Sequence, residues 1–583
     1  MAQDHAALPR APWCPPRPRS AASRTGQGMA SVGSAKVSVL KSDLVVRHET
    51  IAPIDKRFVV LRQIGAGSFG TVSLLRDRRS GVERVCKTVK TRGMKESVLA
   101  QMKREIIMLQ ELDHPRIVRL FEYAEDPQRA ALYLIMEYLP GGSCDKLLSD
   151  GKCPCEDLVA RLMQQVLSAT AYCHARGIVH CDMKPENIIL TKQVTERESS
   201  RDAPCWRCCC NRHFCAEPID CKVIDFGLAA HFVPDDPDSI LQFAGTPAFV
   251  APEVVEVMSG GRAFGPKADI WSIGVVAYNL LTGKLPFGHH GKDYGGDFQQ
   301  VFENIKAFRG VDFNAAEWQD CTEEACSFVE ELLQWDVETR PSAPDALQHE
   351  WVQDRIPLYY KRLRRSMLRS FKGYSRAPQL VKICLLLIAS RTAGRQFKSC
   401  EQAFMRLDVG GAGMITVEDL QSAIDNPGGF CPWLCYPRVS AAEVFREVNL
   451  SRTQGIEYTQ FCAACLYAKL GGKTGRELAR LAFDAFDDDG DGLVTTQAML
   501  AFFATKHREE LPLLSTLPVD RPFRENEFYQ CLRDGQPAGC GPCTFWSFCR
   551  GPTSSAEFND DASDDCSSQT SSVTTSCHQL DLE

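Results

Sequence analysis

The sequence predicts an α+β domain followed by an all-α region, and three observations lead to this fold class. From Phe58 the pattern is first strand-like and then alternates between helix and strand to about Trp351. From about Phe397 to Cys549 the pattern is helical, with short polar loops between the helices. A chain of 583 residues is also too long for one core, so we expect two to four domains.

Composition and charge exclude several classes of protein. Hydrophobic residues make up 44% and charged residues 24% of the chain, which is ordinary for a globular protein. The net charge of -7 does not point to a nucleic-acid partner. The most apolar run, Leu380 to Ser390, is too short to cross a bilayer, and the N-terminus lacks the apolar segment of a secretory signal. We therefore expect a cytoplasmic protein without a transmembrane segment, whose 27 cysteines are mostly reduced thiols.

Changes in composition along the chain mark the boundaries of its parts. The N-terminal segment is rich in Pro, Ala, Ser and Arg, and the C-terminal segment is acidic and rich in Ser; both compositions are typical of disorder. Between them lie the α+β domain, a basic junction and the helical region. The predicted parts are residues 1–50 (disordered), 58–352 (α+β domain), 353–395 (junction), 397–550 (helical region) and 551–583 (disordered tail).

A glycine-rich segment predicts a nucleotide site near the start of the α+β domain. The sequence GAGSFGTV fits the pattern G-x-G-x-x-G-x-V, in which glycines let backbone amides approach phosphate oxygens. Lys87 follows on the next-but-one strand, within reach of the α- and β-phosphates, and Glu105 on a helix is placed to hold it. The candidate nucleotide-binding residues of the loop are Gly65, Ala66, Gly67, Ser68, Phe69, Gly70 and Val72.

A second segment, HCDMKPENIIL, predicts the catalytic groups. Asp182 is the candidate acceptor of a proton from a substrate hydroxyl, and Lys184 is placed to steady a transferred phosphoryl group. Asn187 is the candidate for one Mg²⁺ ligand, and Asp225 of the following DFG sequence for another. Together with Lys87, these residues make up a set suited to phosphoryl transfer.

These motifs, closed by GTPAFVAPE with Glu253 as its last residue, occur in the order found in protein kinases, and the chain resembles that family from Phe58 to Trp351. The resemblance implies the bilobal α+β kinase fold, with ATP and Mg²⁺ as cofactors and proteins bearing Ser or Thr as substrates. Lys184 and the GTP sequence are similar to serine/threonine kinases rather than tyrosine kinases.

The resemblance also assigns roles to residues outside the two segments. Met136 corresponds to the residue that closes the back of the adenine pocket, and the backbone of Glu137 and Leu139 is expected to bind adenine. Asp269 is expected to brace the catalytic loop, and Arg340 to pair with Glu253. A pseudokinase scaffold is the alternative from another class, but Lys87, Asp182, Asn187 and Asp225 are all present, which speaks against it.

Two positions depart from the pattern of the family. Cys181 stands where many kinases have an Arg that contacts a phosphorylated activation loop, so we expect activity without phosphorylation of that loop. Ser143 replaces a Glu that in related kinases contacts the ATP ribose and a substrate arginine. A strict preference for basic substrates is therefore not expected.

A cysteine-rich insert at residues 192–221 lies inside the kinase-like domain. Its potential zinc ligands are Cys205, Cys208, His213 and Cys215. Their spacing is irregular and no second well-spaced pair follows, so we favour a surface insertion with reduced thiols over a zinc site.

The segment DDDGDGLVTTQA, from Asp487 to Ala498, has the outline of an EF-hand calcium loop. Oxygen ligands are expected at positions 1, 3, 5, 7, 9 and 12, with Gly at position 6. Position 6 is Gly492, position 8 is Val494, and position 12 is Ala498 in place of the usual Glu, so we expect a weak site with an affinity of roughly 10⁻⁴–10⁻³ M. The candidate Ca²⁺ ligands are Asp487, Asp489, Asp491, Leu493 and Thr495.

Three other segments have the same outline with fewer carboxylates, at residues 408–419, 449–460 and 536–547. We therefore expect an all-α, calmodulin-like region of four EF-hands in two pairs, of which one hand binds calcium on its own. The alternative is that all the degenerate hands are structural and do not respond to calcium.

A kinase-like domain, a basic junction and an EF-hand region in this order resemble the calcium-dependent protein kinases of plants and protists. The junction begins with the sequence KRLRRSMLRSFKGYSR and continues with apolar residues near helical spacing, which is typical of EF-hand targets. The resemblance implies an autoinhibitory junction that binds the EF-hand lobes within the same chain. Arg362 to Ser366 are the residues expected to occupy the substrate site.

Overall fold

The computed structural model describes residues 41–67, 70–151, 153–195, 219–233, 235–242, 244–258, 260–288, 298–353, 365–392, 397–408, 410–425, 440–471, 475–487, 491–495, 499 and 522–534. Several predicted features lie outside these residues: Ser68 and Phe69, the four potential zinc ligands, Arg362 to Arg364, Asp489, Ala498 and the loop at 536–547.

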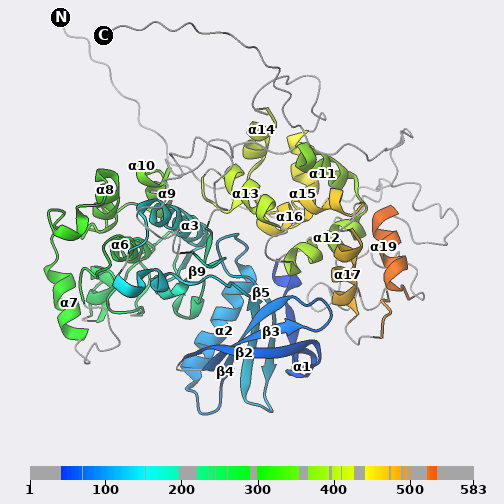
Figure 1. Ribbon diagram of the computed structural model, residues 1–583, viewed down its shortest axis with the longest axis horizontal. Helices are drawn as coiled ribbons and strands as arrows, with labels where there is room; N and C mark the ends of the chain where they lie inside the picture. The colour runs from blue at the N-terminus through cyan, green and yellow to red at the C-terminus, as the bar shows by residue number, and fades with distance from the viewer. Residues whose placement is uncertain are drawn as a thin grey trace, which may run out of the picture.

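The N-lobe, residues 41–137, is built on a six-stranded sheet with the order β1-β5-β6-β4-β3-β2 (Figure 1). All neighbouring strands are antiparallel except β1, which runs parallel to β5. The elements of the lobe are η1 (Lys41–Leu44), β1 (Val46–His48), α1 (Ala52–Arg57), β2 (Phe58–Gly67), β3 (Gly70–Asp77), β4 (Glu83–Lys90), α2 (Glu96–Glu111), β5 (Leu120–Asp126) and β6 (Ala131–Glu137).

The expected disorder of residues 1–50 is wrong for its last ten residues. Leu44 is buried in the core of the C-terminal half, and Val46 pairs with Glu122 of β5. The apolar residues around Leu44 and Val46 are enough to add a strand to the sheet, which the polar composition of the segment as a whole concealed.

The C-lobe, residues 142–353, is mainly helical and lies beside the sheet of the N-lobe in Figure 1. Its long helices α3 and α6 are buried along nearly their whole lengths. Its elements are β7 (Gly142–Ser143), η2 (Cys144–Gly151), α3 (Glu156–His174), β8 (Ile178–Val179), η3 (Pro185–Asn187), β9 (Ile188–Leu190), β10 (Cys221–Val223), η4 (Phe226–Leu228), β11 (Ala230–His231), α5 (Pro252–Met258), α6 (Lys267–Thr282), α7 (Phe298–Ala307), η5 (Ala316–Trp318), α8 (Glu323–Leu332), α9 (Ala343–Ala346) and α10 (Glu350–Gln353).

Local sequence signals explain several helix ends in this lobe. The hydroxyl of Thr322 accepts a hydrogen bond from the Ala325 amide at the start of α8, and Ser342 forms a capping box with Asp345 at the start of α9. Helix α6 ends at Gly283, whose φ of 75° is the left-handed conformation that glycine adopts without strain.

The C-terminal half is helical, as the sequence predicts, and lies on the opposite side of the molecule from α7 and α8 (Figure 1). Its two-stranded sheet pairs Met414 with Glu457 and Ile415 with Ile456. Its elements are α11 (Arg365–Arg376), α12 (Gln379–Arg391), α13 (Lys398–Leu407), β12 (Met414–Ile415), α14 (Val417–Asp425), α15 (Ala441–Val448), β13 (Ile456–Glu457), α16 (Tyr458–Leu466), η8 (Tyr467–Lys469), α17 (Gly475–Phe486) and α19 (Glu525–Asp534).

The two helices of the junction differ in how they are buried. Helix α11 lies in the basic part of the junction and is amphipathic: it buries Met367, Leu368 and Phe371 and leaves Ser366 and Arg369 exposed. The described side chains of α12, from Val381 onward, are buried all around the helix, which corrects the expectation of one apolar face. The reason is that α12 packs against α16, α17 and α19 and also against η1 and the kinase-like domain.

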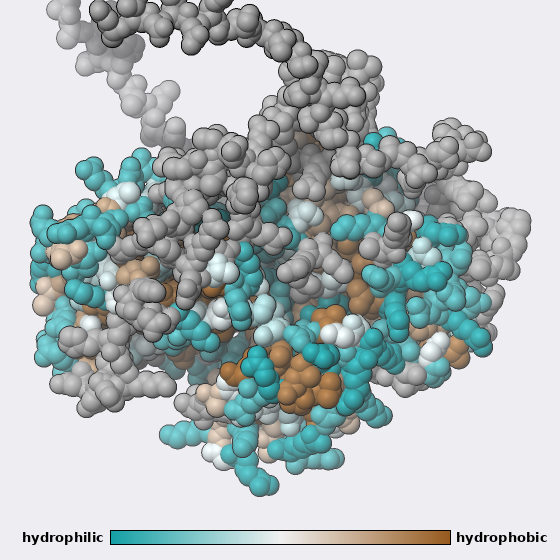
Figure 2. Space-filling view, in the orientation of Figure 1, coloured by the Kyte–Doolittle hydropathy of each residue, from teal (hydrophilic) through white to brown (hydrophobic). Residues whose placement is uncertain are grey.

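The surface of the N-lobe sheet carries exposed apolar side chains. Val60, Leu61 and Ile64 of β2 are exposed, and Figure 2 shows a hydrophobic patch over this sheet. No helix in the described part of the chain is both long enough and apolar enough to span a bilayer.

Candidate active site and calcium loops

The first part of the site is a charge triad between the N-lobe and the DFG segment. Lys87 Nζ lies 2.7 Å from Glu105 Oε1 and 3.0 Å from Asp225 Oδ1. Burial alone would lower the pKa of Lys87, but the two carboxylates outweigh it and raise the pKa above its ordinary value. Lys87 is therefore positively charged and fixed in direction, as a ligand for phosphate oxygens requires.

The catalytic loop places three polar groups around Asp182. Lys184 Nζ lies 2.7 Å from Asp182 Oδ2, and the Thr246 hydroxyl donates to Asp182 Oδ1 at 2.6 Å. Lys184 also donates to Thr246 Oγ1 at 2.7 Å, and Asn187 Nδ2 donates to Asp182 Oδ2 at 3.1 Å. The carboxylate is thus oriented before any substrate binds.

Asp269 holds the backbone of this loop, as predicted. Its carboxylate accepts hydrogen bonds from the amides of His180 and Cys181, both at 2.9 Å, and lies 2.9 Å from His174 Nε2. Cys181 has a φ of 64°, a left-handed conformation that is rare for a residue with a side chain and has to be stabilised by its surroundings. The bonds to Asp269 supply that stabilisation.

The glycine-rich loop and the linker after β6 contain the remaining candidate nucleotide-binding residues. Gly65, Ala66 and Gly67 of β2 pair with Val72, Thr71 and Gly70 of β3. A side chain at position 70 would meet the Thr88 carbonyl oxygen at 1.7 Å, so Gly70 is required by the fold of the loop. At the end of β6, Met136 is half-buried and the Glu137 amide donates to the Arg119 carbonyl at 3.0 Å; Leu139 follows, half-buried.

The donor set fits ATP and Mg²⁺. The Lys87 ammonium and the backbone amides of the glycine loop suit phosphate oxygens. Asn187 uses its amide nitrogen on Asp182, which leaves its amide oxygen for a metal, and Asp225 adds a carboxylate; Mg²⁺ prefers such oxygen ligands.

The structure also forms the expected ion pair between Arg340 and Glu253. Arg340 Nη1 lies 2.6 Å from Glu253 Oε1, and Nη2 lies 3.2 Å from Oε2. The Arg340 side chain is fully buried and also donates to the carbonyls of Gln334 and Lys267. This pair ties the segment after the activation loop to the rest of the C-lobe.

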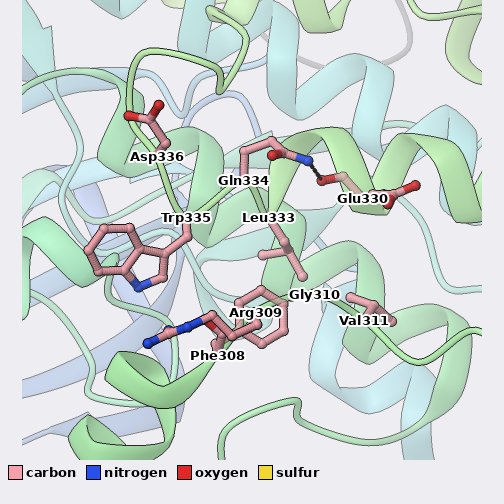
Figure 3. Close-up of a pocket in the computed structure, with 9 residues that line it drawn as sticks. All are labelled: Phe308, Arg309, Gly310, Val311, Glu330, Leu333, Gln334, Trp335 and Asp336. Carbon is pink, nitrogen blue, oxygen red and sulfur yellow. Dashed lines mark hydrogen bonds between the residues drawn. The ribbon is translucent and has the colours of Figure 1, made fainter.

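A cavity of about 600 Å³ lies elsewhere on the C-lobe and is lined by none of the candidate catalytic or nucleotide-binding residues (Figure 3). Arg309 and the half-exposed indole of Trp335 line it, and Gln334 Nε2 donates to the Glu330 carbonyl at its rim. The cavity is therefore not the nucleotide site.

The first two EF-hand loops have the predicted register but not the chemistry of calcium sites. The residues at position 8, Ile415 and Ile456, pair with each other as the sequence predicts. In the first loop, burial raises the pKa of Asp408 to about 7, and this carboxylate accepts from the Gly413 amide at 2.7 Å. Positions 3 and 5 of this loop are Gly410 and Ala412, which offer no side-chain oxygen to a cation.

In the second loop, hydrogen bonds within the loop take the place of a cation. Gln460 Nε2, at position 12, donates to Ser451 Oγ at position 3 at 2.8 Å. Asn449 Nδ2, at position 1, donates to the Thr453 carbonyl at position 5 at 2.6 Å. Oxygens that would face a cation are instead satisfied by N–H groups, so this loop needs no calcium to hold its shape.

The third loop keeps the features of a calcium site in its described residues. Gly492, at position 6, has a φ of 80°, the conformation for which an EF-hand loop uses glycine. Asp487 is buried, and its Oδ1 makes no hydrogen bond within the described part of the chain. A buried carboxylate oxygen without a partner is costly unless a ligand binds it.

The partner of the third loop differs from the expectation. Val494, at position 8, pairs with Phe523 through hydrogen bonds of 2.9 and 2.8 Å, and α19 begins at Glu525. The sequence reading placed the fourth loop at 536–547, which lies outside the described residues. The segment around Phe523 contains two prolines and no loop glycine, so its pattern did not reveal it.

The first EF-hand pair is attached directly to the kinase-like domain. The Thr459 amide and hydroxyl donate to the two carboxylate oxygens of Asp113, both at 2.7 Å, and Asp113 is buried. Gly413 packs so closely on the Tyr172 ring of α3 that a Cβ would lie 1.8 Å from it. This pair therefore lies on the loop after α2 and on α3.

The junction helix α12 ends against two arginines of the N-lobe, close to the end of β6. Arg119 Nη1 donates to the carbonyls of Ala389 and Thr392 at 2.7 and 3.0 Å, and Arg84 Nη2 donates to the Arg391 carbonyl at 2.6 Å. Two arginines thus satisfy carbonyls at the helix C-terminus, where cations are favoured. Through the Arg119 carbonyl, which accepts from Glu137, the junction is connected to the linker.

Three residues of these sites are not predicted by the sequence patterns. Thr246 lies in the quoted GTP motif, but its bond to Asp182 was not expected; His174, on α3, carries no motif signal. Arg79, in the turn between β3 and β4, contacts Asp487 across 408 positions of sequence, and no local pattern reveals such a contact.

Comparisons with known proteins agree with the geometry. The model of the protein kinase domain matches residues 58–352. Calcium-dependent protein kinase 3 of Plasmodium berghei is 30% identical over 436 residues, which cover 74% of this chain and 70% of the relative. Calcium-dependent protein kinase 34 of Arabidopsis thaliana is 26% identical over 543 residues, with 90% and 94% covered. Calcium-dependent protein kinase 11 of Oryza sativa subsp. japonica is 29% identical over 482 residues, with 82% and 75% covered.

Proposed function

Since the chain belongs to the calcium-dependent protein kinase family, we propose that it transfers the γ-phosphoryl group of ATP to serine and threonine hydroxyls under the control of one calcium loop. The kinase activity follows from the family. The assignment of individual residues and of the calcium loop is the proposal.

In the proposed mechanism, Asp182 accepts the proton of the substrate hydroxyl as its oxygen attacks the γ-phosphorus in line with the leaving oxygen. Lys184 neutralises charge on the transferred group, and Lys87, held by Glu105, binds the α- and β-phosphates. Asn187 and Asp225 would hold Mg²⁺, which supplies positive charge to the phosphate oxygens. The protein contributes positioning and fixed charge rather than covalent chemistry.

The main support for the proposal is that the Lys87–Glu105 ion pair and the oriented Asp182 carboxylate occur together in one structure. The pair of Lys87 and Glu105 is formed, and Asp182 is oriented by Lys184 and Thr246. Cys181, which stands where many kinases have an Arg that contacts a phosphorylated activation loop, is buried beside Asp182. That the enzyme does not require phosphorylation of that loop stays a prediction.

Calcium is proposed to bind at the third loop alone. Asp487, Asp491, the Leu493 carbonyl and Thr495 are the described candidate ligands, and Asp489 completes the set in sequence. The Asp487 oxygen that makes no hydrogen bond within the described residues and the backbone of Gly492 support this site, whereas the second loop is satisfied by its own hydrogen bonds. The first pair of hands then serves as a calcium-independent attachment to the kinase domain.

Equilibrium dialysis of the full chain with ⁴⁵Ca²⁺ tests this assignment. We expect one bound calcium ion per chain, with a dissociation constant of roughly 10⁻⁴–10⁻³ M because position 12 lacks its Glu. Asp487→Ala should abolish this binding, and Asp408→Ala, the matched change at position 1 of the first loop, should leave it. Two or more ions per chain, or binding that survives Asp487→Ala, would contradict the assignment.

The junction at residues 353–395 is proposed to connect the calcium loop with the kinase domain. Its helix α11 contacts the EF-hand region through the Ser370 hydroxyl, which donates to the Ala464 carbonyl at 2.7 Å. Lys382 of α12 is buried and donates to Glu447 Oε2 at 2.8 Å. That Arg362 to Ser366 occupy the substrate site when the enzyme is inhibited stays a prediction.

A further inference from the structure

The turn between β3 and β4 is rigid and presents one arginine to the EF-hand region. Asp77 Oδ1 accepts hydrogen bonds from the amides of Arg79 and Ser80 at 2.9 and 3.0 Å. Asp77 Oδ2 accepts from Arg57 Nε at 2.7 Å, which ties the turn to the end of α1. The backbone of Arg79 is therefore fixed, and the direction of its side chain is restricted.

The Arg79 guanidinium meets two carboxylates at the end of α17, a helix that lies beside the N-lobe sheet in Figure 1. Arg79 Nη1 lies 3.3 Å from Asp484 Oδ1 and 3.4 Å from Asp487 Oδ2. Asp484 and Asp487 are three positions apart, so their side chains share one face of the helix end. The Asp487 side chain is 4% exposed and that of Asp484 is 18% exposed, so solvent screens the three charges only in part.

The two carboxylate oxygens of Asp487 thus have different surroundings. Oδ2 faces the kinase-domain arginine, and Oδ1 is buried without a partner in the described residues. Asp487 is also position 1 of the proposed calcium loop, where a carboxylate oxygen would lie within about 2.3–2.6 Å of the ion. A guanidinium at Oδ2 and a divalent cation at the same carboxylate repel each other at close range.

We infer that Arg79 and calcium compete for Asp487. Without calcium, Arg79 holds the third EF-hand against the N-lobe. Calcium binding weakens this contact, and the contact thereby transmits the calcium occupancy of the loop to the N-lobe. This inference rests on the proposed calcium site. Because coupling between two ligands of one group is reciprocal, removal of Arg79 has to strengthen calcium binding.

The test compares Arg79→Ala with Arg78→Ala in the full chain. Both arginines are exposed and both variants remove one positive charge from the same turn, but of the two only the Arg79 side chain forms ion pairs at the end of α17 in the described structure. By equilibrium dialysis with ⁴⁵Ca²⁺ at low ionic strength, Arg79→Ala is expected to bind calcium about 5-fold more tightly than the wild type. Arg78→Ala should change the affinity much less, and high salt should reduce the difference.

A calcium-free measurement follows the contact itself. In hydrogen exchange, the amides of α17 should exchange faster in Arg79→Ala than in the wild type or Arg78→Ala, because the tie to the N-lobe is lost. Equal exchange in all three proteins, or equal calcium affinity in Arg79→Ala and Arg78→Ala, would overturn the competition. A wild type that binds no calcium would instead overturn the proposed calcium site, and the competition with it.

Discussion

Asp182→Asn is expected to lower kcat for a serine peptide by about 10²–10⁴-fold, because it removes the only proposed acceptor of the substrate proton. The asparagine keeps one side-chain oxygen, which can still accept from Thr246, and Lys184 keeps its bond to the Thr246 hydroxyl although it loses its carboxylate acceptor, so most contacts of the loop remain. Steady-state kinetics with Mg-ATP measures the loss, and ATP binding by calorimetry should change little, because Asp182 is not among the nucleotide ligands.

The matched control is Glu256→Gln, the same change of carboxylate to amide on the exposed face of α5. It should retain the kcat of the wild type. If Asp182→Asn kept more than about a tenth of that kcat, Asp182 would not be the base. Loss of both ATP binding and activity would show that the variant had lost its fold. Asp182→Glu, which keeps the negative charge but displaces it, would then be compared with the wild type instead.

Arg340→Met is expected to destabilise the kinase domain by about 3–5 kcal/mol, the usual cost of breaking a buried ion pair by removing one partner. The variant leaves the Glu253 carboxylate without its counter-ion and the carbonyls of Gln334 and Lys267 without their donor. The Arg340 guanidinium also lies over the Trp271 ring, at 5.2 Å from its centroid, so packing is lost with the charge. Thermal unfolding of the full chain, followed by calorimetry, measures the shift in the transition of this domain.

A double variant separates the ion pair from the packing. Arg340→Met combined with Glu253→Gln should recover part of the lost stability, because no unpaired charge then remains in the interior. Equal destabilisation in the single and double variants would show that the pair is not the cause.

Most of the catalytic site could be predicted because its chemistry constrains short segments. The residue types and spacing of the segment from His180 to Leu190 and of the DFG sequence locate Asp182, Asn187 and Asp225 without any knowledge of the fold. In the EF-hand region, the predicted loops at 408–419 and 449–460 have Ile415 and Ile456 at position 8, and the structure pairs these two residues. The register of a loop depends on residues that are close in sequence, so a local sequence pattern is enough to predict it.

Contacts between distant segments could not be predicted in this way. Asp113 binds Thr459 across 346 positions, and nothing around either residue marks it as an interface. Helix α12 was expected to have one apolar face, but neighbours on several sides bury it, including its Lys382. The partner of Val494 was misplaced because the segment at Phe523 keeps the pairing of an EF-hand loop without its ligands. Tertiary packing, rather than local preference, decides all three.

The most direct test of the account is phosphorylation of a serine peptide with Mg-ATP across micromolar to millimolar calcium, for the wild type and Asp487→Ala. We expect the activity of the wild type to rise with calcium and that of Asp487→Ala not to change with calcium. Activity that does not change with calcium in either protein would contradict control by the third loop. It would indicate that the whole EF-hand region has a structural role.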